Sequence, residues 1–165
     1  MGLDRGGIPL ILRLWGNPII GPVVGRIRIS DPEAWRRQVF GGLVAHPEAV
    51  PREMLTMAIA ADGIPGAKLA AHSMLRKVLN MRGVRPNIML RSDMAHLRAP
   101  TLFVWGDRDA YAPPSSGQSL ARQMPHARVE IIADAGHMPQ LDQPNAVADA
   151  ITRHLSDAAP GDAGV

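Results

Sequence analysis

Two stretches of the sequence decide the fold: TLFVWGDRD at residues 101–109 and RVEIIADAGHMP at residues 128–139. The first begins with a short run, residues 101–105, that is apolar on both faces of an extended chain and is ended by Gly106. Such a run is typical of a strand buried inside a parallel sheet. The second stretch begins with residues 128–132, which we interpret as another strand. The sequence therefore predicts two strands of a covered sheet.

Helical patterns follow both predicted strands. One helix is expected over residues 116–124. Another opens at Pro144, where Val147, Ile151 and Leu155 recur every four residues along one face. The order strand, helix, strand, helix implies a parallel strand pair joined by a right-handed crossover. The fold class is therefore α/β.

The first 99 residues have a helical pattern that glycine and proline interrupt. The tripeptide Asp-Pro-Glu at residues 31–33 is a favourable helix start. Further helices are expected over residues 51–63 and 67–80, the second of them stopped by Gly83. We find no convincing strand in this region, and two parallel strands are too few to form a stable sheet alone. The sequence thus indicates either neighbours outside this chain or one part of a longer fold.

Composition places the chain among globular proteins of one-domain size. It has 165 residues, of which 46% are hydrophobic and 20% charged, close to the averages for soluble domains. The absence of cysteine excludes a disulfide framework, a thiolate metal site and a cysteine nucleophile. The N-terminal 25 residues lack the pattern of a signal peptide and are too interrupted to span a bilayer. A cytoplasmic location is therefore the default expectation.

The net charge of +3 is unevenly distributed. Residues 1–99 carry 14 Lys and Arg against 7 Asp and Glu, whereas residues 100–165 carry 4 against 8. The basic residues are scattered, and no nucleic-acid motif or aromatic-rich groove accompanies them. We therefore expect a solvated basic surface and no nucleic-acid partner.

An acid and a histidine stand in the loops that follow the two predicted strands. The first loop contains Asp107 and Asp109, and the second contains His137. Because the carboxyl ends of parallel strands meet at one edge of a sheet, an acid of the first loop and the histidine are expected to lie close together. A buried carboxylate that accepts the Nδ1 proton fixes the histidine tautomer and leaves Nε2 as a general base. Asp107 is expected to be a turn former or a helix cap.

These motifs resemble the C-terminal part of an α/β-hydrolase. In that family the acid lies in a G-x-x-D motif after the penultimate strand, which corresponds to Gly106 and Asp109. The histidine lies in G-H-x-P after the last strand, which corresponds to Gly136, His137 and Pro139. The resemblance is continuous over about residues 98–156.

The resemblance implies a partial α/β-hydrolase fold. Residues 1–97 would be a helical lid, residues 98–156 the terminal β-α-β-α unit of the core, and residues 157–165 a flexible tail. Asp142 stands where the family more commonly has Glu. No metal, nucleotide or organic cofactor is implied.

The implied activity is ester-type hydrolysis of the Ser-His-Asp class, with His137 as base and acid and Asp109 as its orienting partner. The substrate would be small and apolar or ester-like. Epoxide, halide and carbon–carbon bond hydrolysis and cofactor-free haloperoxidation stay open, because the nucleophile separates them. The sequence contains no G-x-S-x-G elbow. Ser73 lacks flanking glycines and lies within a predicted helix, and Ser115 and Ser116 are expected to cap a helix.

We therefore expect the lid and C-terminal half of a longer or split enzyme, inactive without an N-terminal half or a partner such as a second copy. The alternative is a non-catalytic, lid-like binding module that uses an exposed sheet edge or an apolar pocket. Trp105 is expected in the core, and the methionines of the first part could line a pocket or pack helices. Five other histidines form no metal-binding set and are expected to be structural or at the surface: His46, His72, His96, His126 and His154.

Overall fold

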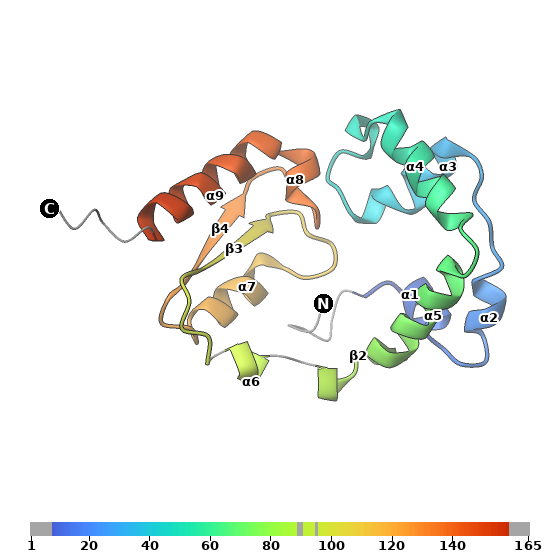
Figure 1. Ribbon diagram of the computed structural model, residues 1–165, viewed down its shortest axis with the longest axis horizontal. Coiled ribbons are helices and arrows are strands. Elements are labelled where there is room, and N and C mark those ends of the chain that lie inside the picture. Colours follow the sequence, from blue (N-terminus) through green and yellow to red (C-terminus); the bar gives the residue numbers. More distant parts are fainter. Residues whose placement is uncertain (1–7, 89–90, 95, 159–165) are drawn as a thin grey trace, which may run out of the picture.

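The computed structural model describes residues 8–88, 91–94 and 96–158. Two parts lie side by side (Figure 1): a helical part, residues 8–88, and a sheet part, residues 96–158. They are joined through a short helix, α6 (Arg91–Met94). The sheet part has the α/β organisation that the sequence predicts.

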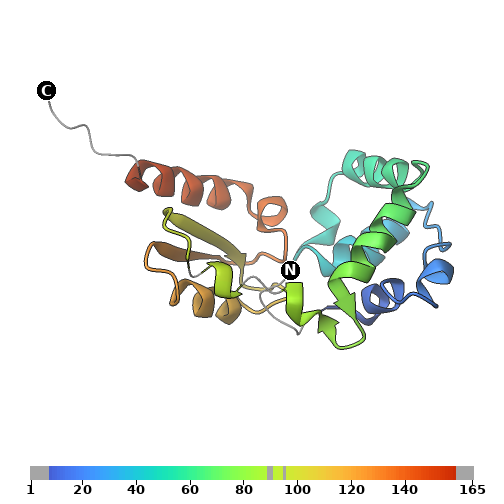
Figure 2. The ribbon, with the colours of Figure 1, turned by 60° about the horizontal axis from the view of Figure 1, so that its bottom comes forward.

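The sheet part is built on two parallel strands, β3 (Thr101–Gly106) and β4 (Ala127–Ile132). They pair in register from Thr101 with Ala127 to Gly106 with Ile132. Helix α7 (Pro114–Ala121) covers one face of this pair and α9 (Pro144–Ala158) the other (Figure 2). The predicted parallel pair with a helical crossover is thus confirmed.

The helices of the sheet part differ from the expected boundaries in three places. Helix α7 begins at Pro114 and ends at Ala121, so Ser115 and Ser116 lie in its first turn and do not cap it. A short helix that the sequence did not predict, α8 (Pro139–Asp142), follows the second loop. Helix α9 continues to Ala158, and therefore includes the first two residues of the expected tail. Residues 159–165 lie outside the described part of the chain.

The helical part contains five α-helices among its described residues. They are α1 (Leu10–Trp15), α2 (Gly21–Val24), α3 (Pro32–Gln38), α4 (Arg52–Asp62) and α5 (Ala67–Val78). The Asp31 carboxylate accepts a 2.8 Å hydrogen bond from the Ala34 N–H and caps α3, as the sequence predicts. Helix α3 stops at Gln38, and 3₁₀ turns at Phe40–Gly42 and Pro47–Ala49 follow it. The chain thereby turns back towards α4.

A small hairpin corrects the expectation that the first 99 residues contain no strand. Strands β1 (Leu79–Asn80) and β2 (Gly83–Val84) pair antiparallel directly after α5. Helix α5 consequently ends two residues before the predicted end. Gly83 adopts φ +110° in the hairpin turn, a conformation that L side chains rarely adopt. The glycine that was expected to stop the helix serves the turn instead.

Two separate apolar clusters hold the helical part together. One is formed by Ile8, Leu75, Leu79 and Val84, and Tyr111 from the sheet part packs against it. A second cluster is formed by four buried side chains, and two more side chains of the sheet part pack against it. These are Phe40, Val44, Val50 and Leu55, with Met138 and Leu141. The loops after β3 and β4 are therefore anchored in the helical part.

The methionines of the helical part do not share one role. Met54 packs against the second cluster, whereas Met57, Met74 and Met81 are 72%, 54% and 48% exposed. Met89 lies outside the described residues. Within the part of the chain that is described, no helix is long and apolar enough to cross a membrane.

Candidate active site

The structure brings the two predicted site residues together at the carboxyl edge of the sheet. Asp109 lies in the loop after β3, and His137 lies in residues 133–138 after β4, here named the histidine loop. Nδ1 of His137 is 2.9 Å from Oδ2 of Asp109. The Asp109 side chain is 5% exposed and that of His137 is 34% exposed. A buried carboxylate thus holds one edge of a ring that solvent can reach.

Asp109 is oriented by the backbone of its own loop. Its Oδ1 accepts hydrogen bonds from the Tyr111 N–H at 2.7 Å and from the Ala112 N–H at 3.1 Å. This local turn is a common use of aspartate. Because Oδ1 is engaged in the loop, Oδ2 is directed to the imidazole.

The ring of Tyr111 lies against the imidazole of His137. The ring centroids are 4.7 Å apart and the planes are inclined by 39°. Burial, and after it the negative charge of Asp109, raises the pKa of the Tyr111 phenol above its usual value, so the ring stays neutral. Sequence reasoning missed this contact. The signal was available, because Tyr111 follows Asp109 by two residues in the same loop.

The second nitrogen of the His137 ring, Nε2, makes no hydrogen bond within the part of the chain that the structure describes. A hydrogen bond from Nδ1–H to a carboxylate leaves the lone pair on Nε2, which can accept a proton. The arrangement can therefore perform acid–base chemistry on a group that approaches this edge.

The loops after β3 and β4 are held tightly to one another. Oδ1 of Asp107 accepts a 3.1 Å hydrogen bond from the Ala135 N–H. Bonds from the backbone of Ala135 and then Asp134 hold the pKa of the Asp107 carboxyl below its usual value. Asp107 is thus a tie between two loops, not the local turn former that was expected. A Cβ on Gly106 would lie 2.1 Å from the Gly136 carbonyl oxygen, so only glycine permits this approach.

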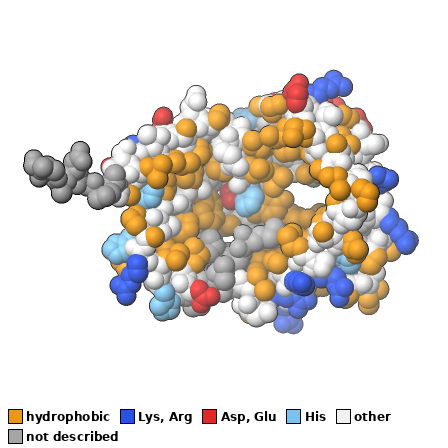
Figure 3. Space-filling view, viewed as in Figure 1, with side chains coloured by type: hydrophobic (Ala, Val, Ile, Leu, Met, Phe, Trp, Pro, Cys, Tyr) orange, Lys and Arg blue, Asp and Glu red, His pale blue; other side chains and the backbone are white. Residues whose placement is uncertain are grey.

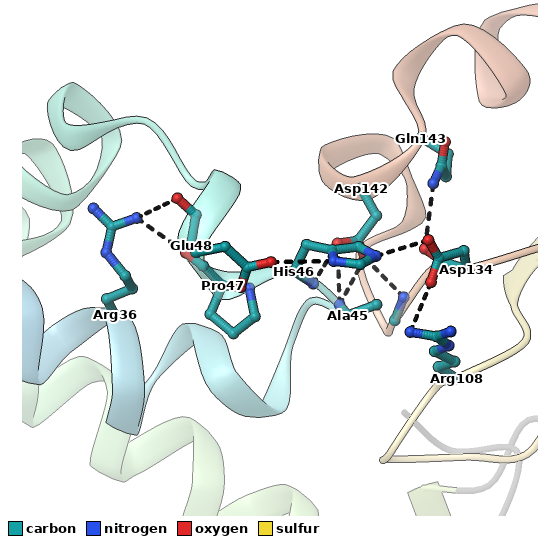
Figure 4. A network of polar contacts seen from close by, with 10 residues as sticks. Arg36, Ala45, His46, Pro47, Glu48, Arg108, Asp134, Asp142 and Gln143 are labelled. Atoms are coloured by element: carbon teal, nitrogen blue, oxygen red, sulfur yellow. Dashed lines mark hydrogen bonds and ion pairs between the residues drawn. The ribbon is translucent and has the colours of Figure 1, made fainter.

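A second histidine–aspartate pair joins the histidine loop to the helical part (Figure 4). Nε2 of His46 is 2.8 Å from Oδ2 of Asp134, and its Nδ1 is 3.2 Å from Oε1 of Glu48. Arg108 forms a 2.7 Å ion pair with the other oxygen of Asp134. The bonds to Asp134 and then Glu48 raise the pKa of His46. This histidine is structural, as the sequence predicts, but it is part of a specific contact.

Asp142 completes the same contact (Figure 4). Its carboxylate accepts hydrogen bonds from the backbone N–H groups of Ala45, His46 and Gly136. The first two donors belong to residues 43–48, which we name the bridging loop, and the third belongs to the histidine loop. One side chain therefore connects the two loops.

The other candidate residues stay apart from this edge or serve the scaffold. Ser73 is exposed within α5 and lies on a regular helix, so it is not on a strained elbow. Nε1 of Trp105 donates a 3.0 Å hydrogen bond to the Ala112 carbonyl, which holds the loop that carries Asp109 against β3. Among the described residues, no group of three or more His, Asp and Glu side chains is arranged to hold a metal ion.

Two hollows lie away from the Asp109–His137 pair. One of about 500 Å³ is lined by Arg26, Arg28 and Lys68 among others, and one of about 490 Å³ lies between β4 and α9. Neither is lined by Asp109 or His137. Figure 3 shows a further hollow on the face viewed there, with hydrophobic side chains around it. The candidate site is therefore identified by the contact between Asp109 and His137 and not by the volume of a cavity.

Comparisons with known proteins agree on one family. A family model described as "Alpha/beta hydrolase family" matches residues 1–150. Esterase YbfF of Escherichia coli is 40% identical over 58 residues, which are 35% of this chain and 23% of that protein. A pimeloyl-[acyl-carrier protein] methyl ester esterase of Xanthomonas campestris is 28% identical over 144 residues, covering 79% of this chain and 57% of that protein.

Solved structures give the same result. A thermophilic esterase from Thermogutta terrifontis superposes with a TM-score of 0.61 at 25% identity, over 90% of this chain and 50% of that chain. The matched regions cover between 23% and 57% of the length of these relatives. The match covers most of this chain, so the folds can be compared over that region, and it leaves about half of the solved esterase unmatched.

Proposed function

Because the chain belongs to the alpha/beta hydrolase family, we propose that it supplies the acid–base machinery for hydrolysis of a carboxylic ester. His137 is the general base and acid, and Asp109 orients its ring and stabilises the imidazolium. The helical part is a lid over the site, and the sheet part belongs to the catalytic core.

One observation carries this proposal: the 2.9 Å contact between Nδ1 of His137 and Oδ2 of the buried Asp109. Structural histidines often bond a carboxylate as well. Here, however, the carboxylate is buried, its second oxygen is engaged by the loop, and the opposite nitrogen of the half-buried ring has no partner among the described residues. Together these features favour a role of His137 as a general base over a purely structural hydrogen bond.

The proposed reaction needs a nucleophile that the complete enzyme would supply. A serine hydroxyl would lose its proton to Nε2 of His137 while its oxygen attacks the ester carbonyl. The imidazolium, stabilised by Asp109, would then donate that proton to the leaving alcohol. Water would repeat the sequence on the acyl-enzyme and release the acid. The nucleophile would be carried by a strand-rich segment with an elbow motif.

Relatives favour an ester as the substrate class. The relatives and structural neighbours include an esterase, a methyl ester esterase and a thermophilic esterase. An apolar helical lid is suited to an acyl chain. The identity of the acyl and alcohol groups depends on the part of the site formed by the nucleophile segment.

A serine-reactive fluorophosphonate probe tests the proposal. We expect no labelling of this chain alone and labelling after it is joined to a segment encoded upstream that contains an elbow serine. Changing His137 to Gln should then abolish labelling, because the serine is no longer activated. Robust labelling of the chain alone, at Ser73 for example, would contradict the proposal.

A non-catalytic binding module is the second candidate function. It is favoured by large apolar side chains that lie exposed on the helical part, among them Ile19 at 83% and Leu69 at 71%. A chain that is monodisperse, unfolds cooperatively and gains no hydrolase activity with any upstream segment would favour this module. A chain that needs an N-terminal segment to stay in solution would favour the enzyme.

A further inference from the structure

The Asp142 carboxylate makes an unusual set of contacts for a side chain outside the Asp109–His137 pair. Its Oδ1 accepts from the N–H groups of Ala45 and His46, both at 3.0 Å. Its Oδ2 accepts from Ala45 at 2.9 Å and from Gly136 at 2.8 Å. Three backbone donors from two loops far apart in the sequence thus converge on one carboxylate.

One of these donors, the N–H of Gly136, belongs to the residue directly before His137. Asp142 therefore contacts the backbone next to the proposed base. On the other side of His137, the Met138 N–H donates a 2.8 Å hydrogen bond to the Leu43 carbonyl. Asp142 therefore holds the peptide group between Ala135 and Gly136, and the bridging loop holds the peptide group between His137 and Met138. The backbone that carries the imidazole is clamped between the helical and the sheet parts.

The close approach of the loops is built into the sequence. A Cβ on Gly136 would lie 2.8 Å from both the Ala45 nitrogen and the Val44 carbonyl carbon. Such a contact is shorter than real Cβ atoms show, so the two backbones meet only because residue 136 is glycine. The bridging loop and the histidine loop thus form one packed unit.

We propose that Asp142 is a positioning residue for His137, and that it acts by locking the bridging loop of the helical part to the histidine loop. The proposal rests on the proposed function of His137 as a base. Ionised carboxylates accept stronger hydrogen bonds than neutral groups and have enough lone pairs for all three donors. The helical part is then more than a cover, because it sets the orientation of the general base.

This role makes different predictions for different side chains at position 142. Asparagine has one acceptor oxygen and would turn its NH₂ donors against backbone N–H groups. Glutamate keeps both oxygens on a stem one methylene longer. Asp142→Asn should therefore release the histidine loop, and Asp142→Glu should retain most of the clamp. Asp149→Asn, at an exposed position of α9, is the matched control.

Nuclear magnetic resonance of the ¹⁵N-labelled chain tests the clamp directly. In the native chain we expect a low-field proton signal from Nδ1–H of His137, because that proton is held by Asp109. Asp142→Asn should lose or broaden this signal, Asp142→Glu should restore it, and Asp149→Asn should leave it unchanged. Retention of the native signal in a folded Asp142→Asn chain would overturn the proposal.

Hydrogen exchange of the unmodified chain keeps the proposal testable if Asp142→Asn does not fold. The N–H groups of Ala45, His46 and Gly136 should exchange at similar rates, since opening of one clamp exposes all three. Exchange of Gly136 that is about ten-fold or more faster than that of Ala45 and His46 would overturn the shared clamp.

Kinetics of the complete enzyme separate this proposal from the proposed function. Asp142→Asn should lower kcat by about 100-fold, the scale expected for a base displaced by about 1 Å, while KM stays nearly unchanged. Asp142→Glu should recover most of kcat. If His137→Gln retains activity, the proposed function fails. If His137→Gln is inactive while Asp142→Asn keeps native kcat, only the positioning role fails.

Discussion

The molecule contains two histidine–aspartate pairs of nearly equal length, and they differ in what surrounds them. The ring of His137 lies 2.9 Å from Asp109, and that of His46 lies 2.8 Å from Asp134. The histidines are equally exposed, at 34% and 35%, but the Asp109 side chain is 5% exposed and the Asp134 side chain 43%. Distance alone therefore does not distinguish the two pairs.

The second ring nitrogen makes the difference in chemistry. Both nitrogens of His46 contact carboxylates, so its protonated form is favoured and no lone pair is left to accept a further proton. Within the described residues, His137 has a partner on Nδ1 alone. A ring with a buried acid on one nitrogen and a lone pair on the other, as in His137, can act as a general base. A ring with acids on both nitrogens, as in His46, serves as a structural link, here named the His46 clip.

The largest expected effect is the loss of kcat on substitution in the Asp109–His137 pair, compared with substitution in the His46–Asp134 pair. In the complete enzyme, Asp109→Asn should lower kcat by about 10⁴-fold, because an amide no longer fixes the imidazole tautomer. His46→Gln should lower kcat far less, because it leaves Asp109, His137 and the backbone hydrogen bonds to Asp142 in place. Hydrolysis of a short-chain p-nitrophenyl ester measures both, and equal losses in the two variants would show that the two histidine–aspartate pairs do not differ in function.

The packing of the loops that carry the catalytic pair gives the next largest effect. Gly106→Ala places a Cβ 2.1 and 2.2 Å from two backbone oxygens, which cannot move aside as a flexible side chain would. We expect a loss of about 3 kcal/mol in the free energy of unfolding. Urea denaturation measures this loss, with Gly41→Ala as the control, since the nearest atom there is 3.9 Å away. A change below about 0.5 kcal/mol in Gly106→Ala would contradict the close approach.

The pH dependence of the His46 clip is the smallest expected effect. Its pKa is raised in the folded chain by Asp134 and Glu48. The stabilisation is therefore fully present below the unfolded value of about 6.5 and is lost as pH rises through the higher folded pKa. Melting temperatures measured on both sides of neutrality should fall with rising pH in the native chain and fall less in His46→Gln. Identical slopes would show that the contact does not titrate.

Much of the fold could be predicted from local pattern, and the failures share a cause. Strands β3 and β4 and helix α4 follow directly from apolar periodicity and from proline and glycine punctuation. The hairpin after α5 was missed because each of its strands has two residues, too short for any period to be detected. The end of α3 at Gln38 is not evident from the sequence, because Val39 and Leu43 continue the helical spacing, whereas burial of Phe40 in the second cluster turns the chain.

The candidate site shows the same division. The meeting of an acid with His137 was predicted because a parallel sheet brings the loops after its strands to one edge, and the choice of Asp109 followed from the resemblance to the G-x-x-D motif. Asp107 was misassigned, since its partner, Ala135, is 28 residues away and no local rule connects them. The clamp at Asp142 was beyond prediction for the same reason, because its donors in the bridging loop are 96 and 97 residues distant.

The sequence by itself determined the α/β character of residues 98–156, the order of their elements and the meeting of an acid with a histidine at one edge of the sheet, because short-range periodicity and loop position encode these features. Only the tertiary structure decided that both ring nitrogens of His46 contact carboxylates, which glycines let the loops meet, and that the helical part holds the loop of His137. Those properties depend on contacts between segments distant in the chain, and the physical reason is that burial and hydrogen bonding act on neighbours in space and not in sequence.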